Sequence, residues 1–129
     1  MRAGYRPRPT RRRGVRCSRW RFYHLVQHAC RELPSRIQRQ LVNVAVTVED
    51  IPSAGLLMPG DDPLGLYQGT PIQERGTGYT MVLPDKITVY RLPLLSTCHT
   101  QRELREEVRL TVLHEVGHYF GLDDDEIPF

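Results

Sequence analysis

The chain has 129 residues, of which 40% are hydrophobic and 26% are charged; these values are typical of one soluble domain that can bury a core without disulfides. No run approaches 18 apolar residues, and the basic N-terminus is not followed by an apolar segment, so we expect no membrane span, no secretory signal and a cytoplasmic location. The three cysteines, Cys17, Cys30 and Cys98, form no CxxC pair, which favours free thiols over a disulfide framework.

The net charge of +3 conceals two oppositely charged regions. Residues 1–40 contain twelve arginines and one acidic residue, whereas residues 41–129 contain six basic and fourteen acidic residues. We predict that residues 1–18 form a flexible basic arm and residues 19–129 the folded domain. The arm could contact the phosphates of nucleic acid, but no folded recognition motif accompanies its charge. Seventeen arginines against one lysine favour a bias in coding composition, so nucleic-acid binding is the weaker interpretation.

The first predicted elements are a helix and a strand. Apolar residues spaced by three and four predict an amphipathic helix from Arg19, carried by Phe22, Val26, Ala29, Leu33 and Ile37. Pro34 is expected to interrupt it and to be the first residue of a second short helix. The β-branched run 41–48 then predicts a strand in the sheet interior.

The middle of the chain is expected to be a long loop followed by a hairpin. Residues 52–78 carry four prolines and six glycines and include a predicted short strand near Leu66 and Tyr67. Segments 79–83 and 86–92 flank Pro84-Asp85 and predict two paired strands, one of them at a sheet edge.

The last predicted element is a helix of about 20 residues that spans roughly 30 Å. Thr100 and Glu103 form a plausible capping box at its start, and Gly121 is the expected stop. Its first half is charged on one side and its second half is almost wholly apolar, as expected for a helix that enters the core.

The second half of this helix contains the motif HExxH, at His114, Glu115 and His118. Residues four apart share a helix face, so the two histidines can bind one Zn²⁺ ion. Glu115 is rotated about 100° from His114, which suits a general base that acts on water. Gly121 can redirect the chain so that Asp124, six residues after His118, supplies a third ligand.

The acidic run after the helix offers alternatives to Asp124. Asp123 and Asp125 are rival third ligands, and we prefer Asp124 on spacing alone. The alternative to a metal site is a packed amphipathic helix, but an unpaired Glu115 would be costly to bury in such a helix.

Other residues carry weaker signals. His24 and His28 are also four apart, but no carboxylate lies between them, which favours an ordinary surface or core pair over a second metal site. His99 could approach the site as an extra ligand or proton donor, again as the weaker interpretation. Aromatic residues in strands usually serve packing, although three of them could stabilise an oxyanion, namely Tyr67, Tyr79 and Tyr90.

The motif HExxHxxGxxD resembles the zincin superfamily, with metzincin-like spacing and aspartate in place of the commoner third histidine. Together with segments 64–69 and 84–90, it resembles the small bacterial zincin-like metallopeptidase family over roughly residues 19–127. This resemblance implies an α+β fold, a small single domain with an N-terminal helix, a small mixed sheet and a C-terminal active-site helix. It also implies a zinc site with hydrolytic geometry, and in such proteins an edge strand beside the active-site helix binds an extended peptide.

The function we expect is therefore a zinc-dependent metallopeptidase that hydrolyses peptide or amide bonds of a peptide or protein substrate through an activated water. The alternative is a zinc-binding interaction module, or a latent protease that needs a partner. Only five residues follow Asp124 in this sequence, so we expect no Met-turn or lower subdomain, and the cleft is expected to be shallow. The sequence specifies neither the preferred substrate nor the oligomeric state.

Overall fold

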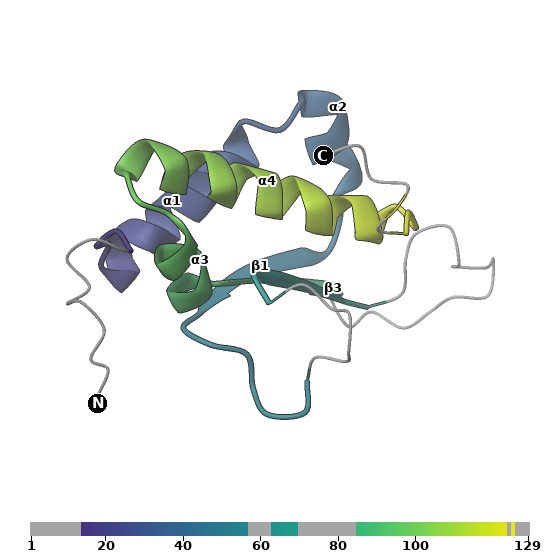
Figure 1. Cartoon of the computed structure of the whole chain (residues 1–129). Coiled ribbons are helices and arrows are strands. Elements are labelled where there is room, and N and C mark those ends of the chain that lie inside the picture. Colours follow the sequence, from purple (N-terminus) through teal and green to yellow (C-terminus); the bar gives the residue numbers. More distant parts are fainter. Residues whose placement is uncertain (1–13, 57–62, 70–84, 124, 126–129) are drawn as a thin grey trace, which may run out of the picture.

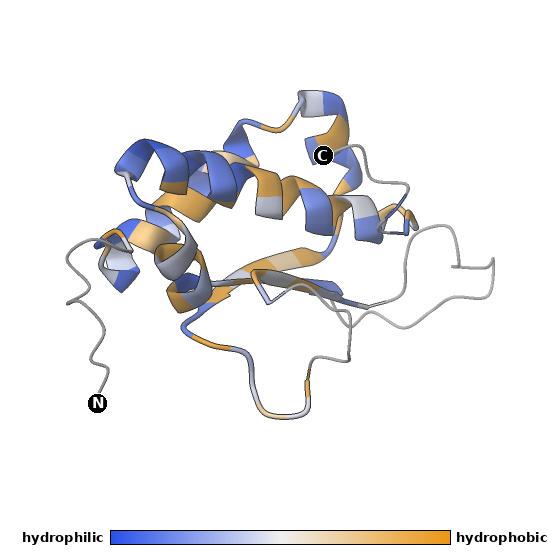
Figure 2. Ribbon diagram, viewed as in Figure 1, coloured by the Kyte–Doolittle hydropathy of each residue, from blue (hydrophilic) through white to orange (hydrophobic). Residues whose placement is uncertain are grey.

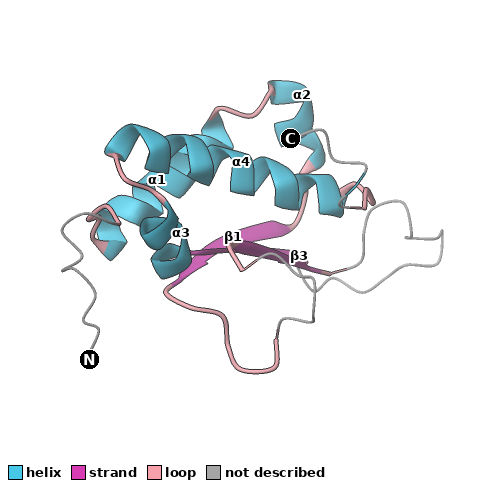
Figure 3. Ribbon diagram, viewed as in Figure 1, coloured by secondary structure: helices cyan, strands magenta, loops and turns pink. Residues whose placement is uncertain are grey.

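The structure is a computed structural model that describes residues 14–56, 63–69, 85–123 and 125. Over these residues the chain forms an α+β domain in which helices cover one face of a small sheet (Figures 1 and 3). The elements in chain order are α1 (Arg19–Arg31), α2 (Ser35–Gln40), β1 (Val44–Glu49), β2 (Gly65–Gln68), β3 (Asp85–Tyr90), α3 (Arg91–Thr97) and α4 (Gln101–Tyr119). The predicted fold class, with N-terminal helices, a mixed sheet and a long C-terminal helix, is confirmed.

The described sheet has the strand order β1-β3-β2. β1 pairs with β3 in parallel, and β2 pairs with β3 antiparallel, with Tyr67 opposite Ile87. Among the strands that the structure describes, the run 41–48 is not interior as predicted, since β1 is an outer strand there and β3 is central. All six residues of β1 are half-buried, whereas five of the six in β3 are buried. A continuous apolar run can thus belong to an outer strand that is covered on one face.

The chain turns from strand to helix immediately after β3. Residues 91 and 92 were expected to continue the strand but begin α3, so this boundary was predicted wrongly. Pro93 is tolerated there because it lies in the first helical turn, where its missing N–H is not required. Arg91 fixes the corner: its Nε donates to Asp50 at 2.8 Å and its guanidinium donates to the carbonyl of Cys17 at 2.7 Å. The hydrogen bond from Arg91 lowers the pKa of Asp50, which keeps this carboxyl ionised.

The N-terminal helices follow the predicted break. The Ser18 hydroxyl caps α1 by accepting from the backbone N–H of Arg21 at 3.2 Å. Pro34 is the N-cap of α2 rather than its first residue, a difference of one position. The strand predicted over 79–83 lies outside the described residues, and the short strand near Leu66 is confirmed as β2.

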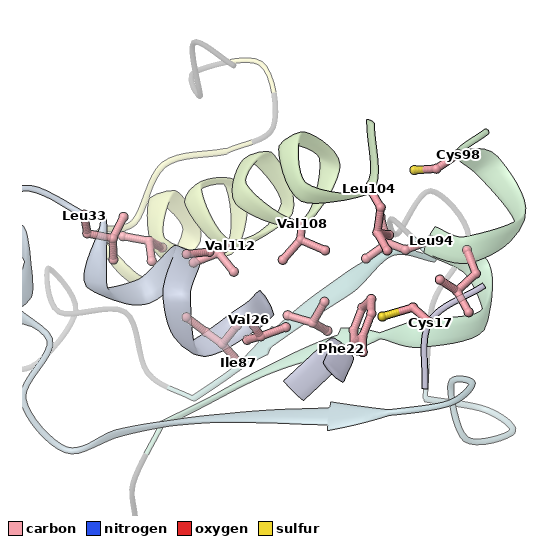
Figure 4. Packing of buried hydrophobic residues seen from close by; sticks show 14 residues of the cluster. Cys17, Phe22, Val26, Leu33, Ile87, Leu94, Cys98, Leu104, Val108 and Val112 are labelled. Atoms are coloured by element: carbon pink, nitrogen blue, oxygen red, sulfur yellow. The ribbon is translucent and has the colours of Figure 1, made fainter. Parts of the chain in front are cut away.

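The hydrophobic core lies between the sheet and the helices. Figure 4 shows Val108 and Val112 of α4 directed toward Val26 of α1 and Ile87 of β3. Each of these four side chains is at most 1% exposed. Figure 2 shows the complementary pattern, with hydrophilic residues on the outer side of the first half of α4. The core therefore fixes which face of α4 meets the sheet.

The start of α4 confirms the predicted cap but not a role for His99. The Thr100 hydroxyl accepts from the backbone N–H of Glu103 at 3.0 Å. The Glu103 carboxylate accepts from the backbone N–H of His99 at 2.6 Å, one residue before the cap position expected for a capping box. His99 is fifteen residues before His114, about 22 Å along the helix axis. The expectation that His99 could approach the metal site is therefore wrong.

Candidate metal centre

The side chains of His114, Glu115 and His118 converge on one region of α4. Their potential ligand atoms all lie within 4.8 Å of one another. The two imidazole rings have centroids 4.8 Å apart and are almost perpendicular, at 88°. Both histidines are half-buried, whereas Glu115 is only 2% exposed. One helix thus places two nitrogen donors and a carboxylate within the span of a single ion's coordination sphere.

A left-handed turn at the end of α4 orients His118. Gly121 has φ +87°, and its N–H donates to the carbonyl of His118 at 2.9 Å. The N–H of Leu122 donates to the carbonyl of Gly117 at 3.0 Å, which completes a Schellman motif. The same turn brings the Leu122 carbonyl to 2.9 Å from Nδ1 of His118.

This contact determines which nitrogen of His118 suits a metal. A carbonyl oxygen can only accept, so Nδ1 of His118 must carry the proton and donate it. The tautomer with Nδ1–H presents Nε2 as the ligand atom, and a hydrogen bond from the other ring nitrogen is the usual companion of a metal-bound histidine. Two imidazoles, one of them held in this way, fit a zinc ion and fit hard oxygen-seeking cations such as Mg²⁺ less well.

Glu115 lies where α4 packs against Gly65 of β2. A Cβ atom added to Gly65 would lie 2.8 Å from Cγ2 of Thr111 and 3.2 Å from Cγ of Glu115. Gly65 is therefore favoured by close approach, since a Cβ at 2.8 Å would force the Thr111 side chain, the helix or the strand to shift. The missing side chain allows β2 to lie directly against the part of α4 that carries the carboxylate.

The predicted third ligand remains a prediction. Asp124 lies outside the described residues. Asp123 and Asp125 are described and exposed, and neither belongs to the cluster formed by the two histidines and Glu115.

The three tyrosines considered from the sequence have different surroundings. The Tyr67 hydroxyl donates to the buried carboxylate of Asp85 at 2.7 Å, and its ring packs edge-on against Tyr119. Tyr90 is completely buried, and among the described residues its hydroxyl has no hydrogen-bond partner. Burial raises the pKa of Tyr90, and the negative charges of Glu49 and Glu115 raise it further, so it stays a neutral phenol. Tyr79 lies outside the described residues.

The second histidine pair forms no metal site within the described chain. His24 packs against the rings of Trp20 and Tyr23, and His28 lies 3.5 Å from the Glu32 carboxylate. Across residues 14–56, 63–69, 85–123 and 125, the His114 cluster is the one group of three or more potential ligands found. Both histidines are exposed, so of the surface and core positions considered for this pair they occupy the surface.

Sequence reasoning missed two contributors to the site. The carbonyl of Leu122 has no sequence signature, although Gly121 indicated that the chain would turn there. Gly65 could have been suspected as a glycine inside a predicted strand, a feature that often marks close backbone approach.

Comparison with known proteins agrees with this geometry. The sequence profile of the zincin-like metallopeptidase family matches residues 41–128. The fold is similar to the solved structure of a conserved hypothetical protein, TTHA0227, from Thermus thermophilus, with a TM-score of 0.54 and 27% sequence identity over 81% of this chain and 94% of that one. No curated protein matches the chain. None of the helices in the described ranges is long and apolar enough to cross a lipid bilayer.

Replacing Gly65 by alanine should destabilise the domain by about 1–3 kcal/mol, because the new methyl group overpacks the contact between β2 and α4. Urea unfolding measures this change. The control is the same substitution in a Thr111→Ser background, which removes the Cγ2 atom that the methyl would strike. Part of the lost stability should return there, and strictly additive effects would contradict the proposed contact.

Replacing Gly121 by alanine should cost about 1–2 kcal/mol through the left-handed backbone and should also weaken zinc binding about 10- to 100-fold by releasing His118 from the Leu122 carbonyl. Gly121→Asn is the milder control, because asparagine tolerates this conformation. Competition with a chromogenic chelator measures the affinity. If Gly121→Ala lost stability but kept full zinc affinity, the turn would not orient the ligand.

Proposed function

Because the chain belongs to the zincin-like metallopeptidase family, we propose that it is a zinc-dependent hydrolase of peptide or amide bonds. In this proposal His114 and His118 hold the ion and Glu115 is the general base. Asp124 is proposed as the third ligand on the spacing HExxHxxGxxD. The single observation that best supports a functional metal site is the convergence of His114, Glu115 and His118, whose potential ligand atoms lie within 4.8 Å of one another.

The chemistry needs an acid–base group and an electrophile close together. A bound zinc ion would polarise the scissile carbonyl and lower the pKa of a water molecule toward about 7. Glu115 would accept the proton of the attacking water and then deliver it to the leaving amine. Its carboxylate is suitably placed, since it lies within 4.8 Å of the histidine nitrogens and is shielded from solvent.

β2 offers a way to hold an extended substrate. It is an outer strand of the described sheet, and its residue Gly65 packs against the segment of α4 that bears Glu115. A peptide that adds to an exposed strand edge is bound by main-chain hydrogen bonds and so needs little sequence specificity. We propose this binding mode by analogy with the family.

In the second candidate function the protein binds zinc but does not catalyse hydrolysis. The chain would then be a zinc-stabilised interaction module, or a latent protease that a partner completes. This alternative is kept because two histidines and a carboxylate can bind an ion without catalysing a reaction. Both functions predict zinc binding, so they differ only in catalysis.

The substitution Glu115→Gln distinguishes the hydrolase from the zinc-binding interaction module. In the zinc-loaded protein the substitution should lower hydrolysis of a fluorescence-quenched peptide library by about 10²- to 10⁴-fold while zinc stoichiometry and folding are kept, because only the proton acceptor is lost. Glu106→Gln is the matched control on the same helix, since Glu106 is exposed and pairs with Arg109. Equal activity in wild type and Glu115→Gln would rule out Glu115 as the base. Bound zinc without turnover in wild type would favour the interaction module.

A further inference from the structure

A concave site separate from the candidate metal centre lies between α1 and the first half of α4. It is a cavity of about 360 Å³ whose wall is largely basic and aromatic. We call it the basic groove, and it is lined by Trp20, Arg21, His24, Leu25, His28, Arg31 and Arg105. Arg105 precedes His114 by nine residues, about 14 Å along α4, so the groove does not share its walls with the metal centre.

The charge of the basic groove is not neutralised within the described chain. Arg21, Arg31 and Arg105 are exposed, and no carboxylate of the described residues lies within 4 Å of their guanidinium groups. The one ion pair that the described residues form at its wall is the 3.5 Å contact between His28 and Glu32. Three guanidinium groups around one cavity repel each other until an anion binds, and the planar guanidinium matches phosphate well.

Exposed aromatic rings stand beside these charges. Trp20 is 71% exposed and Tyr23 is 44% exposed, although both are large apolar side chains. The ring of His24 lies against both, with centroids 4.3 Å from Trp20 and 5.6 Å from Tyr23. An exposed indole next to a basic cavity is the arrangement by which proteins stack a nucleobase while arginines bind the backbone.

We propose that the basic groove binds single-stranded nucleic acid. The phosphates contact Arg21, Arg31 and Arg105, and a base stacks on Trp20. An acidic peptide would satisfy the arginines but would leave the exposed indole without a role, so the aromatic residues favour a nucleic acid. This proposal is independent of peptide hydrolysis, and it differs from binding by the arm alone because it places the contacts on folded helices.

The chain provides its own probe, because Trp20 is its single tryptophan. A mixed-sequence RNA of about 12 nucleotides, within the usual site size of single-strand binders, and DNA of the same sequence would be titrated into the full-length protein. Tryptophan emission and the anisotropy of the labelled oligonucleotide are followed together. Stacking predicts quenching that saturates together with the anisotropy. Trp20→Leu should weaken binding at least about fivefold.

The arginines are tested by a charge-matched pair of variants. Arg21→Gln with Arg105→Gln removes two phosphate contacts and should reduce the slope of log affinity against log salt concentration by about 1.4. Arg36→Gln with Arg39→Gln removes the same charge from exposed positions on α2 and should leave the slope nearly unchanged. Thermal unfolding checks that all variants are folded.

Three results would overturn the proposal. Equal slope changes in both double variants would mean that overall charge, including the arm, binds the oligonucleotide. Saturated anisotropy with unchanged tryptophan emission would mean that no base stacks on Trp20. Quenching by polyglutamate but not by the oligonucleotide would assign the groove to an acidic peptide instead.

Discussion

The candidate metal centre depends on how α4 ends. Gly121 adopts a left-handed conformation that the other residue types rarely accept, and this turn ends the helix. The Leu122 carbonyl then meets Nδ1 of His118, which sets the tautomer and the ring orientation of one proposed ligand. A continued helix would carry this carbonyl away from the histidine. The helix stop is therefore part of the candidate site.

Core packing of α4 fixes the orientation of the helix that carries the candidate ligands. Core residues of α4 such as Val108 and Val112 lock its rotation against α1 and β3, so the histidines and Glu115 cannot turn away without disrupting the core. Gly65 then lets β2 approach within contact distance of Glu115. α4 is thus at once a core element, the carrier of the candidate ligands and the neighbour of β2. A single long helix is a compact way to build such a site in a small domain.

The helices and the candidate ligand cluster could largely be predicted from the sequence, because local residue patterns encode helices and motifs well. The spacing of Phe22 and its apolar partners predicted α1, and HExxH predicted the cluster. The position of β1 at the sheet edge and the turn into α3 could not be predicted, because strand order and the contacts of Arg91 depend on residues distant in the chain. The hydrogen bond from His118 to the Leu122 carbonyl could not be predicted either, since a backbone carbonyl has no signature in the sequence. Asp124 and the arm stay predictions.

The central claim is that α4 and the turn after it form a zinc site. The most direct test is elemental mass spectrometry of the purified protein after zinc reconstitution, comparing wild type with His118→Ala and with Asp124→Ala, and with His28→Ala as a control histidine outside the cluster. One zinc per chain is expected in wild type and in His28→Ala, and loss of zinc in His118→Ala. Loss in Asp124→Ala as well would identify the third ligand. No zinc in the wild-type protein, or full occupancy in His118→Ala, would mean that these residues form no zinc site and that the motif is a packed helix.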